Sequence, residues 1–156
     1  MRLDEIELAG WGERIGETVG TPTVIALQGP LGAGKSVLAR AIGRGAGVRE
    51  TMPSPSYNLL FRYVTDSRTE VVHLDLYRIE SSEELWELGW AQIPGEADLV
   101  LVEWPERAKG ALPVDHWVIE LSAPGDQPLL RDVEVRRVGS PSELAAFPMS
   151  VSGSRR

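Results

Sequence analysis

Cysteine is absent from this chain of 156 residues. A disulfide, a thiolate metal site and a cysteine nucleophile are therefore excluded. The sequence also lacks an apolar run of the ~18 residues that a membrane helix needs, and its acidic N-terminal stretch has no signal-peptide pattern. We expect a soluble protein of the reducing cytoplasm with no membrane partner.

Positive charge is in short supply. The 16 basic residues are outnumbered by 23 acidic ones, which leaves a formal net charge of −7. A protein that grips a nucleic-acid backbone usually carries a basic patch, and the local basic clusters here are only Arg136-Arg137 and Arg155-Arg156. We therefore do not expect tight direct binding of nucleic acid, although action on one through a partner stays open.

Lysine is rarer still, since Lys35 and Lys109 stand against fourteen arginines. Lys35 belongs to Gly-Pro-Leu-Gly-Ala-Gly-Lys-Ser at residues 29–36, which we call the P-loop because it fits the pattern G-x-x-x-x-G-K-[ST]. In such a loop, glycines let backbone N–H groups turn toward phosphate oxygens. The lysine reaches the β- and γ-phosphates, and the hydroxyl of the last residue, here Ser36, ligates Mg²⁺.

The residues around the P-loop support this interpretation over a glycine-rich turn with an incidental lysine. A β-branched apolar run precedes it at 23–28, and apolar residues at helical spacing follow it at 37–42. Strand, glycine loop and helix form the context that the motif requires. The nucleotide-binding residues predicted here are Leu31, Gly32, Ala33, Gly34, Lys35 and Ser36.

The rest of the chain reads as one α/β domain. Further helices are predicted at 4–19 and 81–88, and further strands at 58–64, 70–75, 98–105, 117–121 and 131–135. The last two strands alternate with period two and predict an antiparallel pair. We expect a P-loop NTPase three-layer sandwich with a mixed, mostly parallel sheet over residues 1–138. Residues 139–156 are rich in Ser, Gly and Pro and predict a flexible C-terminal tail.

Two of these strands end in an acid. Glu103 follows the apolar run 99–102, and Asp75 follows residues 71–74. A P-loop NTPase needs a carboxylate near Mg²⁺ at the end of a strand beside the P-loop strand. Either acid fits this role, by holding a metal-bound water or orienting the attacking water. The alternative is an acid that merely faces solvent.

Other residues leave two interpretations open. The loop Ser54-Pro55-Ser56-Tyr57 is either a switch near the γ-phosphate or a proline-stiffened connection. Trp104 either covers the nucleotide site or offers a partner an aromatic anchor, or else packs at the core boundary. Arg78 and Arg131 are phosphate-clamp candidates or solvated surface residues. His73 is expected to be an interior histidine rather than a catalyst.

Four segments together resemble one family, the bacterial TsaE proteins, also called YjeE. The order and spacing of the segments match that family: Gly-Pro-Leu-Gly-Ala-Gly-Lys-Ser at 29–36, Ser-Pro-Ser-Tyr at 54–57, His-Leu-Asp-Leu-Tyr-Arg at 73–78 and Val-Glu-Trp-Pro-Glu at 102–106. The resemblance implies a small P-loop ATPase with a mixed sheet that binds ATP and Mg²⁺ and hydrolyses ATP slowly by itself. It also implies a role in the threonylcarbamoyladenosine modification of tRNA. The protein would act with the TsaB–TsaD heterodimer, in which TsaD modifies the adenosine beside the anticodon, and would meet tRNA only through that complex.

The resemblance also assigns roles to residues. By matching position, Lys35 and Ser36 take the phosphate and Mg²⁺ roles, and Glu103 is a further Mg²⁺ ligand. Trp104 and Arg131 match residues close to the nucleotide, and Glu5 loosely matches a region that touches the base. The implied catalytic residues are Lys35, Asp75 and Glu103, with Asp75 also counted among those that bind the nucleotide.

Three positions depart from the family. Pro30 stands where an acid is usual, and Ser36 and Ser56 stand where threonine is usual. The two serines keep the hydroxyl groups, so the expected chemistry is retained.

Other functions remain as alternatives. A small-molecule or nucleoside kinase would need an acceptor pocket and an arginine-bearing lid. No arginine-rich segment of suitable length follows the P-loop, but Arg62, Arg68 and Arg78 keep the kinase open. A GTPase switch is disfavoured because there is no Asn-Lys-x-Asp motif, Lys109 lying in Ala-Lys-Gly. A non-catalytic nucleotide-binding adaptor also stays open.

Overall fold

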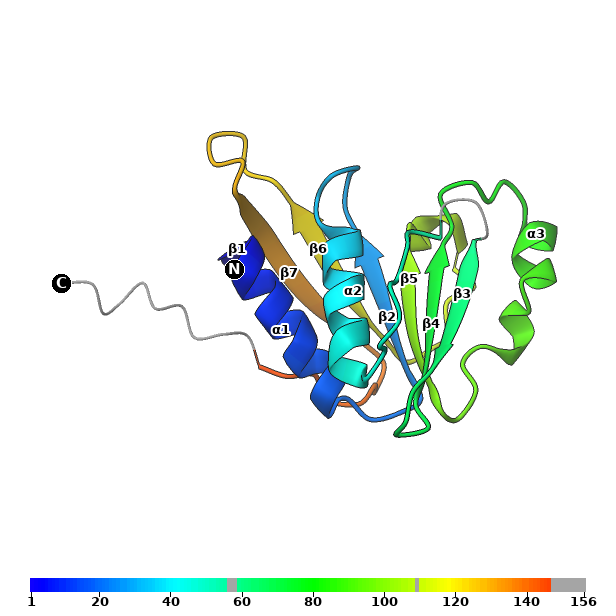
Figure 1. Ribbon diagram of the computed structural model, residues 1–156. Coiled ribbons are helices and arrows are strands. Elements are labelled where there is room, and N and C mark those ends of the chain that lie inside the picture. Colours follow the sequence, from blue (N-terminus) through cyan, green and yellow to red (C-terminus); the bar gives the residue numbers. More distant parts are fainter. Residues whose placement is uncertain (56–58, 109, 147–156) are drawn as a thin grey trace.

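The computed structural model describes residues 1–55, 59–108 and 110–146. They form a seven-stranded sheet of order β1-β7-β6-β2-β5-β4-β3 (Figure 1). The strands are β1 (Arg2–Asp4), β2 (Thr23–Gln28), β3 (Leu60–Val64), β4 (Glu70–Asp75), β5 (Asp98–Glu103), β6 (His116–Ser122) and β7 (Leu130–Val138). The helices are α1 (Glu5–Thr18), α2 (Lys35–Ala46) and α3 (Ser82–Glu87), with 3-10 turns η1 (Trp90–Gln92) and η2 (Pro105–Ala108). None of the helices in these ranges has the length and apolar character to cross a membrane.

The sheet is mixed. β6, β2, β5 and β4 are parallel neighbours, and β3 and β7 pair antiparallel with β4 and β6. β1 runs antiparallel to β7, so five of the seven strands point the same way. Parallel strands covered on both faces have continuous apolar runs, which explains the unbroken apolar run 99–102 in β5. The predicted mixed, mostly parallel sheet is confirmed.

Helices cover both faces of this sheet. On β5, Leu99 and Leu101 point into the core beneath α1 and α2. Val100 and Val102 point the other way, into the core that α3 and η1 cover with Leu85 and other residues. This alternation follows from the period of two along a strand. It yields the predicted three-layer sandwich.

Glycines let α1 and α2 pack closely in front of the sheet in Figure 1. A Cβ added at Gly16 would lie 2.0 Å from the backbone oxygen of Ile42, and one at Gly45 would lie 2.0 Å from that of Glu13. Glycine disfavours an isolated helix, yet here only a residue without a side chain fits between the two backbones. The predicted start of α1 is confirmed, because Asp4 accepts a hydrogen bond from the Glu7 N–H in a capping box.

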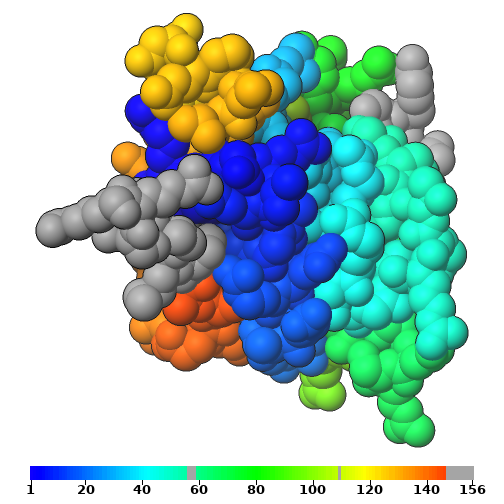
Figure 2. Space-filling view, turned by 60° about the vertical axis from the view of Figure 1, so that its left-hand side comes forward, coloured from blue at the N-terminus to red at the C-terminus, as the bar shows by residue number. Residues whose placement is uncertain are grey.

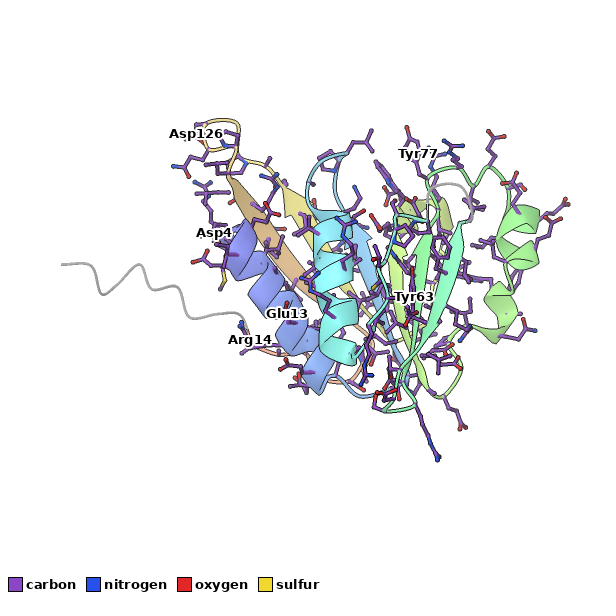
Figure 3. The ribbon with its side chains drawn as sticks, viewed as in Figure 1. Asp4, Glu13, Arg14, Tyr63, Tyr77 and Asp126 are labelled. Carbon is purple, nitrogen blue, oxygen red and sulfur yellow. The ribbon has the colours of Figure 1, made fainter. Side chains whose placement is uncertain are left out.

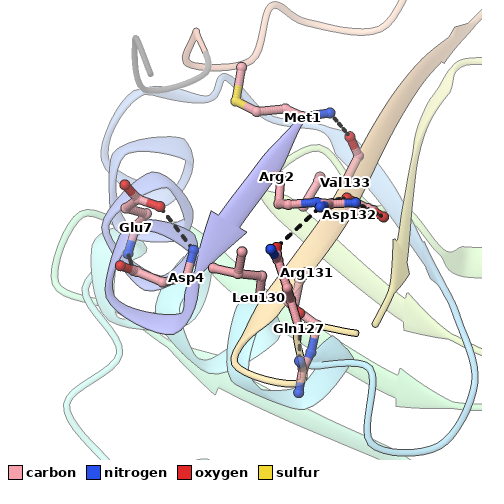
Figure 4. A network of polar contacts seen from close by, with 9 residues as sticks. All are labelled: Met1, Arg2, Asp4, Glu7, Gln127, Leu130, Arg131, Asp132 and Val133. Atoms are coloured by element: carbon pink, nitrogen blue, oxygen red, sulfur yellow. Dashed lines mark hydrogen bonds and ion pairs between the residues drawn. The ribbon is translucent and has the colours of Figure 1, made fainter. Parts of the chain in front are cut away.

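The short strand β1 was not predicted. The Met1 ammonium donates to the Val133 oxygen at 2.8 Å, and Arg2 Nε donates to Asp132 at 2.8 Å (Figure 4). Three residues show no measurable period, so only the pairing with β7 identifies this strand. The pairing ties the start of α1 to β7.

Part of the predicted tail, residues 139–146, lies within the described residues. Trp11 Nε1 donates to the Ala145 oxygen at 3.0 Å, and Trp117 Nε1 donates to the Ser142 oxygen at 2.7 Å. Leu144 packs against the core beneath α1. Figure 2 shows this segment, in orange-red, beside the C-terminal half of α1, in blue. Residues 147–156 lie outside the described residues.

Candidate functional site

The P-loop joins β2 to α2 as the sequence predicts. Gly29 has φ 146°, and a Cβ there would lie 2.3 Å from the Leu121 oxygen, so the loop passes too close to β6 for a side chain. Gly32 and Gly34 also have positive φ, 78° and 102°. Gly34 is the N-cap of α2. The loop therefore brings the first N–H groups of α2 to its inner side, where an anion binds favourably.

A cleft of about 640 Å³ opens beside the P-loop at the carboxyl ends of β2, β5 and β4. Figure 3 shows the two flanks of this end of the sheet, with Asp126 in the β6–β7 loop and Tyr77 beyond β4. The residues lining the cleft come from the P-loop and α2, from the end of β1 and α1, from the loop after α2, from the ends of β4 and β5, and from the β6–β7 loop and the start of β7. They are Asp4, Glu5, Ile6, Leu8, Leu31, Gly32, Gly34, Lys35, Ser36, Val37, Ser54, Asp75, Glu103, Trp104, Pro128, Leu129 and Arg131.

The Lys35 side chain lies folded back onto its own loop. Its ammonium donates to the backbone oxygens of Gly29 and Pro30, the latter at 2.9 Å, and sits 4.3 Å from the centre of the Trp104 ring. The residue is only 5% exposed. Burial lowers the pKa of the amine, while Glu103 and other nearby acids oppose that shift.

Glu103 is the best-connected acid of the cleft. Ser36 Oγ donates to its Oε1 at 3.0 Å, and His73 Nε2 lies 2.6 Å from its Oε2. Ser36 is the second residue of α2, and Glu103 is the last residue of β5, next to β2 in the sheet. The predicted metal ligands, Ser36 and Glu103, are therefore brought together.

Asp75 stands beside Glu103, because the two residues are partners in the register of β4 and β5. It is 7% exposed and accepts a hydrogen bond from the Tyr77 N–H at 2.9 Å. Burial raises the pKa of its carboxyl, the Tyr77 N–H lowers it, and the charge of Glu103 raises it further. A carboxyl in this environment is suited to accept a proton.

Trp104 lies at the core boundary, as one interpretation expected, and its role toward a nucleotide or a partner stays a prediction. It lines the cleft and packs at the edge of the core under α3. Its φ of 56° is unusual for a bulky residue. The Tyr77 ring packs on it with 4.9 Å between centres, and Arg107 lies 5.9 Å from the Tyr77 ring. Trp104 thus lines the cleft beside Lys35, and Tyr77 packs on Trp104 from outside the cleft lining.

Arg131 lies at the opposite wall. Its Nε donates to the Ala33 oxygen at 3.0 Å and its Nη2 to the Gly32 oxygen at 3.3 Å. Its Nη1 donates to the Pro128 and Leu130 oxygens at 2.8 Å. The guanidinium therefore braces the P-loop against β7, which β1 holds in turn (Figure 4).

The remaining predicted residues lie as follows. Leu31 is exposed on the rim of the cleft, and Ala33 is buried beneath the loop. Of the loop 54–57, Ser54 lines the cleft, while Ser56 and Tyr57 lie outside the described residues. Arg78 is not among the residues that line the cleft.

Sequence reasoning missed the contact of His73 with Glu103. His73 is interior as predicted, with 0% exposure. Side chains two apart on a strand share a face, so His73 lies on the face of Asp75, and Glu103 is paired with Asp75. The alternation of side chains along β4 and β5, combined with the pairing of these two strands, is therefore the signal that predicts this contact. Ile6 and Leu129, each 84% exposed on the rim, gave no signal in the sequence.

The residues present fit Mg²⁺ and a nucleoside triphosphate. The hydroxyl of Ser36 and the carboxylate of Glu103 are hard oxygen donors of the kind that Mg²⁺ prefers. Within the described residues, no cluster of three or more His, Cys, Asp or Glu could hold a metal. Mg²⁺ commonly takes one or two protein oxygens and completes its shell with waters and substrate phosphates. Ser36 and Glu103 supply that number.

The fold and the P-loop define a class, the α/β proteins of the P-loop type. Within it, the model of one family, "Threonylcarbamoyl adenosine biosynthesis protein TsaE", matches residues 3–133. The chain belongs to the TsaE family.

Individual proteins that are similar to this chain carry the name of the same family. A Nostoc protein, "tRNA threonylcarbamoyladenosine biosynthesis protein TsaE", is 40% identical over 99 residues, covering 62% of this chain and 60% of its own. A Treponema pallidum protein of the same name is 32% identical over 107 residues, covering 69% of this chain and 78% of its own. The match thus spans less than two thirds of the Nostoc relative. The crystal structure of YdiB from Bacillus has the same fold, with a TM-score of 0.65 and 23% identity over 89% of this chain and 84% of that chain.

Proposed function

We propose that this protein is a Mg²⁺-dependent ATPase required for the threonylcarbamoyladenosine modification of tRNA, acting with a TsaB–TsaD complex in the cytoplasm. One observation carries the proposal. The Ser36 hydroxyl and the Glu103 carboxylate lie 3.0 Å apart at the start of α2, beside Lys35. Membership of the TsaE family supports the pathway.

The P-loop binds the triphosphate of ATP in this proposal. Its N–H groups and the N-terminus of α2 attract the phosphates. Lys35 exchanges the carbonyl oxygens of Gly29 and Pro30 for phosphate oxygens, which are stronger acceptors because they are charged. Ser36 and Glu103 hold Mg²⁺. When bound, the metal neutralises charge on the phosphate oxygens.

Asp75 supplies the proton acceptor. Its raised pKa and its place beside Glu103 suit a carboxylate that orients a water and takes its proton. Trp104, supported by the Tyr77 ring, shields the Lys35 side of the cleft from solvent.

The charge of the chain bears on its partners. A net charge of −7 disfavours tight binding of tRNA by this protein alone. We therefore assign contact with tRNA to the partner complex, with ATP turnover here energising or resetting it.

The test is a reconstituted modification assay with TsaB and TsaD. Lys35→Ala and Glu103→Ala are each expected to abolish ATP turnover and tRNA modification. Arg44→Ala is the control, because Arg44 lies on the same helix and pairs with Glu13 at the surface. Full modification by the Lys35 variant contradicts the mechanism.

The same assay separates the alternatives. Transfer of the γ-phosphate to a metabolite rather than to water would favour a small-molecule or nucleoside kinase. Preference for GTP over ATP would favour a switch GTPase. Nucleotide binding without turnover, even with TsaB and TsaD present, would favour an adaptor.

A further inference from the structure

Two different elements hold the two oxygens of the Glu103 carboxylate. Ser36 of α2 lies 3.0 Å from Oε1, and His73 of β4 lies 2.6 Å from Oε2. The Glu103 and His73 side chains are 3% and 0% exposed. Since the buried carboxylate is held at both oxygens, it has one orientation.

The surroundings of Nδ1, the second ring nitrogen of His73, indicate which of the two ring nitrogens carries a proton. Nδ1 is buried and has no hydrogen-bond partner among the groups that the structure describes. An imidazolium would place an N–H donor at Nδ1 with no acceptor, which is costly in the interior. A neutral ring that carries its proton on Nε2 has only a lone pair at Nδ1, and an unpaired neutral acceptor costs less than an unpaired charged donor. Nε2–H then donates to the Glu103 carboxylate.

We propose that His73 is a positioning residue for the metal site. Its neutral imidazole donates Nε2–H to Oε2 of Glu103 and so orients the carboxylate toward Ser36, where the proposed Mg²⁺ would bind. The presence of Mg²⁺ at this site rests on the proposed function, whereas the hydrogen bond between His73 and Glu103 does not depend on any ligand. Hydrogen bonds of this kind to metal-ligating groups orient them and strengthen metal binding.

The first experiment measures how ATP binding depends on Mg²⁺ concentration. His73→Leu keeps the apolar volume and removes the donor, and His73→Gln restores an amide donor at a similar reach. We expect the leucine variant to need about 10–100-fold more Mg²⁺ for half-maximal enhancement of ATP binding, the typical effect of losing such a partner. The glutamine variant should fall within a few-fold of the wild type. ATP binding in EDTA should be equal in all three.

His116→Gln is the matched control. His116 is the only other histidine in the chain and is the first residue of β6, at the end of that strand opposite the cleft. Its Mg²⁺ dependence should equal that of the wild type. A leucine variant with wild-type Mg²⁺ dependence overturns the positioning role, and so does a glutamine variant as weak as the leucine variant. A wild type that binds no ATP at all contradicts the proposed function instead.

The second experiment reads the hydrogen bond in the wild type, without nucleotide and without a variant that must fold. In ¹⁵N-histidine-labelled protein, NMR distinguishes protonated from unprotonated ring nitrogens. His73 is expected to be protonated at Nε2 alone. His116 is expected to carry a proton at Nδ1, because that atom lies 2.7 Å from the Pro113 carbonyl oxygen. A proton on Nδ1 of His73 overturns the proposal.

Discussion

Asp75 and Glu103 end neighbouring parallel strands and face each other in register. Their environments differ. Glu103 is held by Ser36 and His73, whereas Asp75 accepts one backbone hydrogen bond, from Tyr77, and has a raised pKa caused mainly by burial. Two carboxylates with different surroundings suit two roles. In the proposed mechanism, Glu103 holds the metal and Asp75 takes the proton.

Asp75→Asn is expected to abolish turnover and to raise the melting temperature at neutral pH. Because the folded protein raises the pKa of Asp75 above its ordinary 3.8, the folded state binds this proton more tightly than the unfolded chain. In the wild type, the protonated carboxyl of Asp75 therefore favours the folded state below pH 3.8, and this stabilisation is lost as the pH rises through the raised pKa. Thermal unfolding of both proteins between about pH 4 and pH 7 measures the effect. Parallel curves of melting temperature against pH would contradict it.

Gly29→Ala is expected to destabilise the fold by about 2–4 kcal/mol, through strain at positive φ and a steric clash. The added Cβ would lie 2.3 Å from the Leu121 oxygen, at a φ of 146°. Gly125→Ala is the control, since a Cβ there meets no heavy atom within 4 Å. Urea unfolding of the two variants gives both free energies. A Gly29 variant as stable as the Gly125 variant would show that the loop does not pass so close to β6.

Arg131→Lys is expected to destabilise the protein by about 1–3 kcal/mol and to weaken ATP binding. The planar guanidinium of Arg131 reaches the Ala33, Gly32 and Pro128 oxygens at once, and an ammonium cannot reproduce that fork. Arg136→Lys, on the same strand, should change the free energy of unfolding by less than about 0.5 kcal/mol. Equal effects of the two substitutions in urea unfolding would show that the brace on the P-loop is unimportant.

Trp11→Phe and Trp117→Phe are each expected to cost about 1–3 kcal/mol, because each variant loses the N–H that binds the C-terminal segment together with part of the indole ring volume. These donors hold the Ala145 and Ser142 oxygens. The double variant should show faster hydrogen exchange in peptides covering 140–146, measured by mass spectrometry. Unchanged exchange would mean that other contacts hold the segment.

Local patterns predicted most of the fold. The apolar runs of β2 and β5, the capping box of α1 and the glycines of the P-loop each act over a few residues, so the sequence shows them directly. β1 was missed because three residues carry no period, and its pairing partner lies about 130 positions away. The contact of His73 with Glu103 was missed for a related reason, since it depends on which strands are neighbours.

The sequence by itself determined the P-loop, the two acids at strand ends and the resemblance to TsaE, because these are properties of short segments and of their order. Only the tertiary structure decided that Glu103 meets Ser36 across 67 positions and that Arg131 braces the P-loop. It also placed residues 142–145 against Trp11 and Trp117. The physical reason is that strand order and backbone approach depend on contacts between distant segments, whereas the P-loop conformation depends on glycines only two to five positions apart.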